Sequence, residues 1–264
     1  MLKTRIFTSL LLMILIIIVF FIANHNIVII FCLLSCLLAS YELLCMYQIK
    51  FFPTLSAMVL LTLVAVLLYL YNGAIVSHII SIIIIFTWGL LIPSILYKKP
   101  KQFSLNFLMV LMFIILLPTF YTLLILYNAI GPLQLISLMA SAWTCDIGAY
   151  FIGKKYGKHK LAKTISPNKS IEGAIGGILV TIIYFMVLKS FNLTIYLVNY
   201  FDVIKFAIIL SIVGIMGDLL ESWFKRVAGV KDSGHLLPGH GGVFDRIDSL
   251  LAVVPVAFVL LGSI

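Results

Sequence analysis

The residue types most able to do chemistry gather in one polar stretch, residues 217–249, of an otherwise apolar chain. The stretch begins with Asp218, and near its end Asp245 and Asp248 stand three positions apart, where a helix is expected to start. Residues at this spacing project from one face of a helix. Two or three converging carboxylates without a soft ligand suit a hard cation, so the stretch predicts a Mg²⁺ site.

A glycine turn and four basic residues accompany these acids. In the turn, Pro238-Gly239-His240-Gly241-Gly242, the paired glycines let the backbone approach a ligand and aim N–H groups at an anion. The basic residues, which suit the phosphates of a nucleotide, are Lys225, Arg226, Lys231 and Arg246. Together these are the parts of a phosphoryl- or nucleotidyl-transfer site. Because no Ser-His or Cys-His nucleophile is evident, we expect direct displacement without a covalent intermediate.

The elements that must position these residues are membrane helices. Of the 264 residues, 63% are apolar and 10% are charged, against about a quarter charged in ordinary soluble domains. A chain of this size could not hide so much apolar surface from water, which excludes a soluble globular protein. We expect an all-α, polytopic integral membrane protein with about nine transmembrane helices. The expected spans are 6–23, 27–47, 52–71, 74–97, 105–127, 133–152, 171–188, 203–224 and 244–264.

The basic residues predict how the chain is oriented. Alternate loops hold 16 of the 18 lysines and arginines, and the two exceptions are Lys189 and Lys205. Since positive loops favour the cytoplasmic side, we expect a cytoplasmic N-terminus and take the net charge of +9 as a sign of topology rather than of a nucleic-acid partner. The first run, 6–23, lacks a small-x-small cleavage pattern and is expected to remain as a helix.

The expected spans divide the chain into two parts. Residues 1–130 hold five spans, and residues 131–264 hold four spans together with the catalytic loops. In this topology every acidic residue except Asp202 lies in a cytoplasmic loop or in the cytoplasmic half of a span. A carboxylate at membrane depth marks a functional site by default. We expect Glu42 to pair with a neighbouring polar group and Glu221 to pair with Lys225 one turn later.

Residues 222–248 resemble the defining motif of phosphatidate cytidylyltransferases, also called CDP-diacylglycerol synthases. The motif reads Ser-x-x-Lys-Arg, then Lys-Asp, then Pro-x-His-Gly-Gly-x-x-Asp-Arg-x-Asp, and each fixed position is met. These positions are Ser222, Lys225, Arg226, Lys231, Asp232, Pro238, His240, Gly241, Gly242, Asp245, Arg246 and Asp248. Residues 146–173 are similar to the family's D-x-x-AY and ISPKKT-x-EG segments, with Asn168 and Ser170 in place of the usual Lys and Thr. The resemblance covers the chain from Trp143 onward.

This resemblance implies transfer of the cytidylyl group of CTP to phosphatidic acid, which gives CDP-diacylglycerol and pyrophosphate. It assigns metal binding to Asp218 and Asp245, with Asp248 as a further ligand or a neighbour, and implies Mg²⁺ together with K⁺ as a second cation. The residues expected to act in catalysis are Asp218, Lys225, Arg226, Lys231, Asp245 and Arg246. Those expected to bind substrate are Asp146, Ser166, Lys169, Asp232, His240, Gly241 and Gly242. A homodimer in a bacterial plasma membrane, with its site facing the cytoplasm, is also expected.

Two other functions remain as alternatives. A CTP-dependent lipid-alcohol kinase could use a similar basic, Mg²⁺-dependent pocket, but it would transfer the γ-phosphate and release CDP. A secondary transporter would also have many spans and buried acids. It should show inverted repeats and broken helices that meet at the midplane of the bilayer, and the sequence shows neither.

Overall fold

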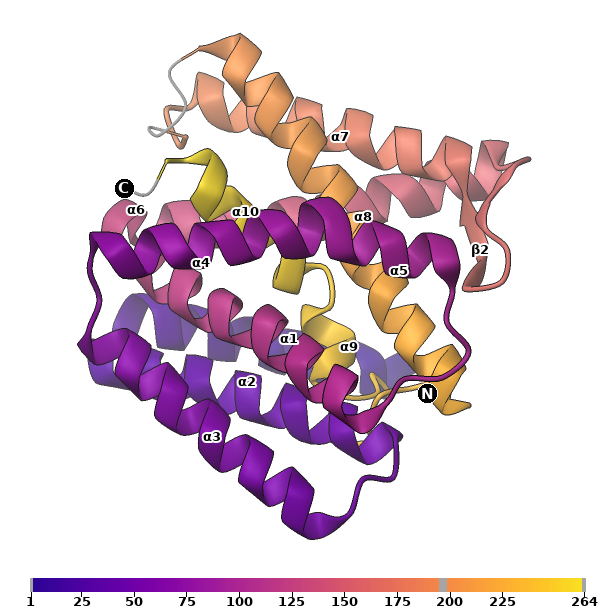
Figure 1. The fold of residues 1–264 in the computed structure, drawn as a ribbon. Coiled ribbons are helices and arrows are strands. Elements are labelled where there is room, and N and C mark those ends of the chain that lie inside the picture. The colour runs from indigo at the N-terminus through magenta and orange to yellow at the C-terminus, as the bar shows by residue number, and fades with distance from the viewer. Residues whose placement is uncertain (1, 195–198, 263–264) are drawn as a thin grey trace.

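The computed structural model describes residues 2–194 and 199–262, which are almost entirely helical (Figure 1). The helices are α1 (Leu2–Ile17), α2 (His25–Met46), α3 (Phe51–Leu70), α4 (Ala74–Phe86), α5 (Ile92–Lys98), α6 (Leu105–Tyr156), α7 (Ile171–Ser190), α8 (Tyr200–Ala228), α9 (Phe244–Ile247) and α10 (Leu250–Leu260). Two π-helical segments, η1 (Ile18–Ile22) and η2 (Thr87–Leu91), follow α1 and α4. The strands β1 (Lys160–Ala162) and β2 (Ser166–Ser170) pair as an antiparallel hairpin. The expected all-α membrane class is confirmed, and the hairpin is an addition to it.

Polar residues at the ends of the apolar runs set the limits of several helices. Asn24 accepts a hydrogen bond from the Ile27 N–H at the start of α2, and Ser170 accepts one from the Gly173 N–H at the start of α7. Each satisfies an N–H that has no partner within its helix. α8 ends at Gly229, whose φ of 72° is the left-handed conformation typical of a helix end.

Six helices within the described residues are long and apolar enough to cross a membrane, so the expected count of nine spans is not confirmed. Two expected spans are joined in α6, where Gly131 interrupts the helical backbone with φ 78° and ψ 168° just before Pro132. The expected last span is broken into α9 and α10. The 11 residues of α10 make a rod of only about 16 Å, against the roughly 30 Å of a hydrocarbon core.

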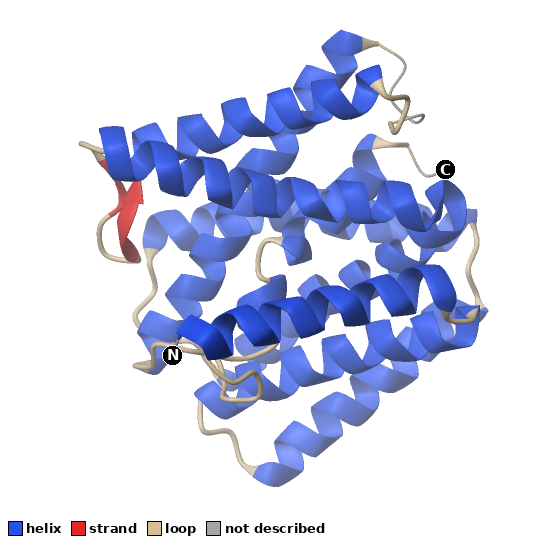
Figure 2. Cartoon of the chain, turned by 180° about the vertical axis from the view of Figure 1, so that it is seen from behind, coloured by secondary structure: helices blue, strands red, loops and turns tan. Residues whose placement is uncertain are grey.

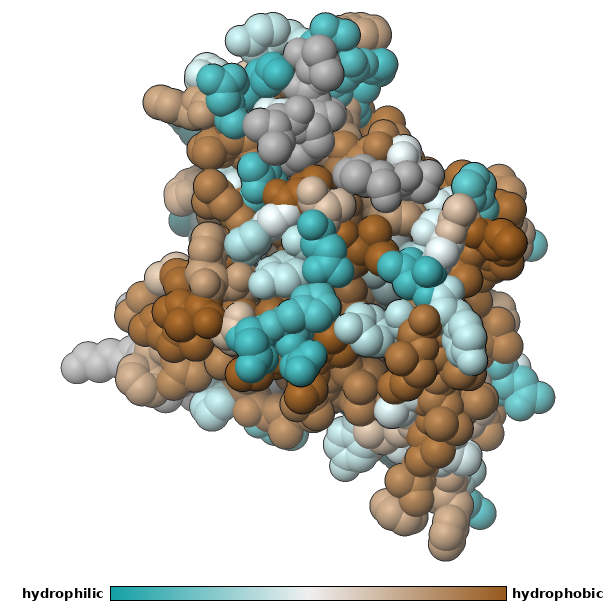
Figure 3. Space-filling model, turned by 90° about the vertical axis from the view of Figure 1, so that its left-hand side faces the viewer, coloured by the Kyte–Doolittle hydropathy of each residue, from teal (hydrophilic) through white to brown (hydrophobic). Residues whose placement is uncertain are grey.

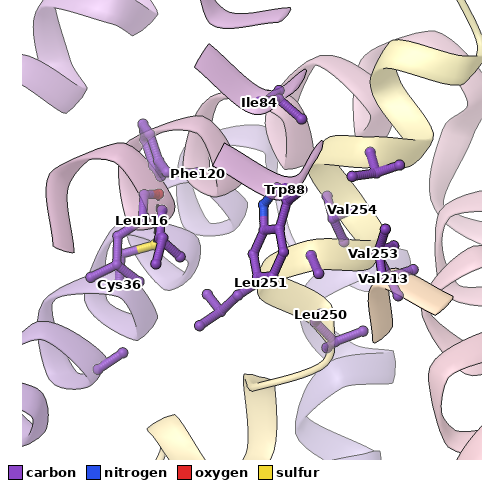
Figure 4. Close-up of a cluster of buried hydrophobic side chains, with 14 of the residues drawn as sticks. Cys36, Ile84, Trp88, Leu116, Phe120, Val213, Leu250, Leu251, Val253 and Val254 are labelled. Carbon is purple, nitrogen blue, oxygen red and sulfur yellow. Dashed lines mark hydrogen bonds between the residues drawn. The ribbon is translucent and has the colours of Figure 1, made fainter. Parts of the chain in front are cut away.

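The short helix α10 lies in the centre of the molecule instead. It packs against α4, α6 and α8, and Val253, Val254 and Phe258 are almost fully buried. Figure 4 shows the indole of Trp88, from η2, beside Leu251 and Val254. Residues 250–258 of α10 are all buried, so this helix fixes the preceding turn, in which Ser249 is buried and Asp248 is half-buried.

The loops that carry many lysines gather at one end. Figure 1 shows the start of α1, the end of α5 and the β1–β2 hairpin on its right-hand side, whereas the start of α4 and the end of α10 lie on the left. Figure 2 confirms from behind that the start of α1 and the strands share one side. Figure 3 looks onto the opposite end, where hydrophobic side chains cover the flanks and hydrophilic ones gather toward the middle and top. Exposed apolar flanks between two polar ends suit a bilayer.

Small residues let α6 and α7 approach closely. A Cβ on Gly173 would lie 2.8 Å from the Ala149 carbonyl oxygen, and one on Gly177 would lie 2.6 Å from the Cys145 carbonyl oxygen. The two helices are therefore in backbone contact, as small-xxx-small faces allow. Gly173 and Gly177 serve packing within one chain, and this contact leads directly into the β1–β2 hairpin.

Candidate active site

Three carboxylates from separate parts of the polar stretch converge at the end of the molecule that carries the hairpin. One oxygen each from Asp218 and Glu221 of α8 and from Asp248, in the turn before α10, lie within 4.8 Å of one another. We call these three residues the carboxylate cluster. Gly217 makes the approach possible, since a Cβ there would lie 2.6 Å from the Asp248 carbonyl oxygen. The cluster consists of hard oxygen donors only, and such donors fit Mg²⁺.

The surroundings of Asp248 disfavour the charged form of its carboxyl. Burial raises the pKa of its carboxyl well above the usual range, and the charges of Asp218 and Asp146 raise it further. The backbone N–H of Ser249 and the charge of Lys169 oppose these effects without outweighing them. A cation among the three carboxylates would relieve this repulsion, so the residues present fit a metal ion.

Two lysines balance the negative charge. Lys169, at the end of the hairpin, forms an ion pair with Asp218. Lys225, one turn after Glu221, places its Nζ 2.7 Å from Glu221 Oε1 and 2.7 Å from Asp245 Oδ1. The expected pair of Glu221 with Lys225 is confirmed. Glu221 thus joins Asp218 and Asp248, whereas Asp245 lies outside the cluster but directly beside Glu221, with which it shares Lys225.

Asp245 organises the loop between α8 and α9. Its Oδ2 accepts hydrogen bonds from the Ser233 N–H and hydroxyl and from the Gly242 N–H, each at 2.8 Å. Burial would raise the pKa of this carboxyl, but hydrogen bonds, led by the one shared with Glu221, hold it well below its usual range. Gly241 has a φ of 81°, and a Cβ there would lie 2.4 Å from Asp245 Oδ2. The glycine turn therefore wraps around Asp245. The role of Asp245 as a metal ligand stays a prediction.

The carboxylate of Glu42, on α2, holds the same loop from the other side. Its Oε1 accepts from the Val243 N–H at 3.0 Å, and its Oε2 accepts from the Phe244 N–H at 2.8 Å. The hydroxyl of Ser233 lies 3.0 Å from Oε2. The expectation that Glu42 pairs with a polar neighbour is confirmed, but the sequence did not indicate that this neighbour is the loop around 242. The only sequence signal for such a role was a lone acid within an apolar run.

Asp146 and Arg246 border the cluster. Asp146, on α6, interacts electrostatically with Asp218, Lys169 and Arg246. Both Asp146 and Arg246 have exposed side chains. The structure therefore brings together the two halves of the expected site, one from residues 146–170 and the other from residues 217–249. An accessible mixture of acids and bases results, which could hold a metal ion beside a chain of phosphates.

The hairpin is attached to α8 by a basic residue of the motif. Arg226 donates from Nε to the Ile165 carbonyl oxygen at 3.2 Å, next to the half-buried Ser166. At the other end of the hairpin, Glu172 accepts hydrogen bonds from the Lys158 N–H at 3.1 Å and the His159 N–H at 3.2 Å. Fixing the hairpin in this way brings Lys169 to Asp218.

The remaining expected residues lie on the loop between α8 and α9. Lys231 and Asp232 are exposed there. The ring of His240 contacts two hydroxyl groups of α1: its Nδ1 meets Thr8 Oγ1, and its Nε2 lies 3.0 Å from Ser9 Oγ. The N-terminal helix therefore closes one side of the glycine turn, a contact that the sequence did not predict.

Known proteins are similar to this chain over much of its length. A family model described as "Cytidylyltransferase family" matches residues 3–264. A protein named phosphatidate cytidylyltransferase from Staphylococcus haemolyticus is 52% identical over 122 residues, which cover 45% of each chain. Proteins of the same name from Staphylococcus saprophyticus and Staphylococcus aureus are 47% and 48% identical over 125 residues. These alignments span 45–46% of this chain and of each relative. Because the family model matches nearly its whole length, the chain belongs to the cytidylyltransferase family.

Proposed function

We propose that this protein transfers the cytidylyl group of CTP to phosphatidic acid and releases pyrophosphate, so that CDP-diacylglycerol is formed in the membrane. The observation that carries this proposal is the carboxylate cluster with Lys169, Lys225 and Arg246 around it. Support also comes from the shared name of the three staphylococcal relatives.

The reaction would be a direct displacement at phosphorus. A phosphate oxygen of phosphatidic acid attacks the α-phosphorus of CTP, the bond to the β-phosphate oxygen breaks, and pyrophosphate leaves with that electron pair. The phosphatidate monoester is already a competent nucleophile, so His240 need not act as a base. Mg²⁺ bound by Asp218, Glu221 and Asp248 would neutralise charge on the phosphates, and K⁺ is proposed as a second cation.

The basic residues would bind the two substrates. Lys169 pairs with Asp218, and Lys225 pairs with Glu221 and Asp245. A phosphate bound beside these carboxylates would therefore lie close to both lysines. The exposed Arg246 and Lys231 would bind the outer phosphates of CTP or the phosphatidate headgroup. Asp146 would contact the nucleotide or orient Arg246.

We place the site at the cytoplasmic face of a bacterial plasma membrane. The lysine-rich loops share its end of the molecule, and positive loops favour the cytoplasm. CTP would arrive from the cytoplasm and phosphatidic acid from the adjoining leaflet. A homodimer is also proposed, through a surface other than the Gly173 and Gly177 face, which packs within the chain.

Purified protein in detergent with Mg²⁺, phosphatidic acid and CTP labelled separately at the α- and γ-phosphates tests the reaction. We expect α-label to enter the lipid phase, and transfer to fall at least about 100-fold in Asp218→Asn, which removes a charge from the cluster. The matched control is Asp202→Asn, a partly exposed acid of the same helix whose partners among the described residues, Lys205 and Asn199, are local.

The rival functions give different results in the same assay. Transfer of γ-label to a lipid alcohol would favour the kinase and contradict the cytidylyl transfer. A folded protein that transfers neither label with any of several lipids would contradict the enzyme proposal and favour a transporter.

A further inference from the structure

Glu42 is the one acidic residue of α2, and it reaches a loop about 200 positions later in the sequence. From its contacts we infer that Glu42 is a positioning residue that sets the place of Asp248 in the carboxylate cluster. This inference rests on the metal-dependent site of the proposed function and extends it to the N-terminal half of the chain.

The first step is the direction of α9. Both oxygens of Glu42 accept hydrogen bonds from successive backbone N–H groups, those of Val243 and Phe244. Val243 is the N-cap of α9 and Phe244 its first residue; the helix has only four residues, and Asp248 follows immediately after it. A four-residue helix has little stability of its own. The hydrogen bonds of Glu42 at the start of α9 therefore determine the position of the segment that contains Asp248.

The second step is the lack of free space around the carboxylate. Glu42 is 3% exposed. A Cβ on Gly242 would lie 2.2 Å from Glu42 Oε2, and a Cβ on Gly234 would lie 2.8 Å from Oε1. The backbone at Gly242 and at Gly234 therefore packs closely against the carboxylate of Glu42. A shift of this loop would require the Glu42 side chain to shift with it. This close fit distinguishes Glu42 from a loosely held buried acid.

The third step is the connection to Asp245. The hydroxyl of Ser233 lies 3.0 Å from Glu42 Oε2 and 2.8 Å from Asp245 Oδ2, so it joins the two carboxylates. Asp245 is in turn paired with Lys225, which contacts Glu221 of the cluster. Glu42 therefore acts on the cluster by two routes, through α9 to Asp248 and through Ser233 to Glu221. Partners that orient metal ligands commonly change metal affinity by about 10- to 100-fold when they are replaced.

The test measures metal binding without substrates. Glu42→Gln keeps the size of the side chain but turns one acceptor into an NH₂ group, which faces a backbone N–H donor. Mn²⁺ replaces Mg²⁺ as the probe, and its bound fraction is measured by electron paramagnetic resonance on the full-length protein in detergent. We expect Mn²⁺ affinity to fall about tenfold in Glu42→Gln.

The matched control is Ser40→Ala. Ser40 lies two positions away on α2, is fully buried and donates only to the Leu37 carbonyl oxygen of its own helix. We expect it to bind Mn²⁺ as the wild type does. A folded Glu42→Gln protein with wild-type Mn²⁺ affinity would overturn the inference, and so would an equal loss in Ser40→Ala. If Glu42→Gln does not fold, Mn²⁺ affinity is measured in Glu42→Asp, which keeps the charge but shortens the side chain. Unchanged Mn²⁺ affinity in that variant would also overturn the inference.

This readout separates the inference from the proposed function. Wild-type protein that binds Mn²⁺ but transfers no α-label would contradict the cytidylyl transfer and leave the role of Glu42 intact. Wild-type protein that transfers the label, with Mn²⁺ affinity independent of residue 42, would contradict only the role of Glu42.

Discussion

At the scale of single residues, the site depends on which partner each carboxylate has. Asp218 and Glu221 lie three apart on α8 and share a face, so their proximity follows from helix geometry. Asp245 and Asp248 have the same spacing but different surroundings, because Asp245 accepts hydrogen bonds from two backbone N–H groups of the loop and Asp248, among the described residues, accepts only one, from the adjacent Ser249. Glu221 therefore lies beside Asp218 and Asp248, whereas Asp245, to which the resemblance assigns metal binding, pairs with Lys225, and its role as a ligand stays a prediction.

The replacement Glu221→Gln tests whether Glu221 contributes to metal binding. We expect the Mg²⁺ concentration that gives half-maximal α-label transfer to rise about tenfold or more, because one carboxyl ligand of the cluster is replaced by an amide. The measurement is a Mg²⁺ titration of transfer at fixed CTP and phosphatidic acid, with Asp202→Asn alongside. An unchanged Mg²⁺ requirement in Glu221→Gln would show that Glu221 only balances Lys225.

A pair of glycine replacements separates backbone strain from damage to the loop. Gly229 and Gly241 both have positive φ, but a Cβ on Gly229 meets nothing within 4 Å, whereas one on Gly241 meets Asp245. We expect Gly229→Ala to cost about 1–2 kcal/mol of stability with activity retained. Gly241→Ala should lose more stability and most of its activity. Thermal unfolding and α-label transfer check both variants, and equal behaviour would contradict the wrapping of the turn around Asp245.

At the scale of elements, the contact between α6 and α7 carries the hairpin to the site. The close approach depends on Gly173 and Gly177, and the hairpin that joins the two helices delivers Lys169 to Asp218. Arg226 then attaches the hairpin to α8. A change that separates α6 from α7 should therefore reach the cluster without touching any of its residues.

Gly177→Val tests this coupling. The added Cβ would lie 2.6 Å from the Cys145 carbonyl oxygen, so the helices must move apart, at a cost of about 1–3 kcal/mol. We expect a lower unfolding temperature and reduced α-label transfer. Gly89→Ala is the control, because a Cβ there meets nothing within 4 Å. If Gly177→Val unfolds at the wild-type temperature, α6 and α7 are not held in the contact described.

At the scale of the whole molecule, apolar flanks border the end seen in Figure 3, and the candidate site lies toward the opposite end, where the lysine-rich loops gather. The N-terminal half contributes to this site directly, through Glu42 of α2 and through the hydroxyls of α1 that meet His240. The division of the chain at 130/131 falls beside Gly131, where α6 is interrupted. That division stays a prediction.

Orientation in the membrane can be measured with single cysteines. Cys45 is exposed and is first replaced by Ser, while the other three cysteines are buried. In intact cells we expect an impermeant maleimide to label Gly73→Cys, near the start of α4, and to leave Lys163→Cys unlabelled until the cells are opened, because positive loops face the cytoplasm. Labelling of Lys163→Cys alone in intact cells would reverse the orientation.

The sequence by itself determined the membrane class and most of the helix-forming runs, and it predicted which residues form the site. These follow from local properties: the transfer of apolar side chains to lipid, the length of each run and the spacing of residues such as Asp218 and Glu221. It did not determine that α6 joins two expected spans or that α10 is too short to cross, because both depend on packing around Gly131 and in the core.

Only the tertiary structure decided which carboxylates meet. Asp248 reaches Asp218 because Gly217 admits its backbone, Asp245 turns toward Lys225, and Glu42 holds the loop from α2. Each of these contacts joins residues that are distant in sequence or belong to different elements. Their free energy depends on burial and on competing hydrogen-bond partners, which a single sequence does not specify.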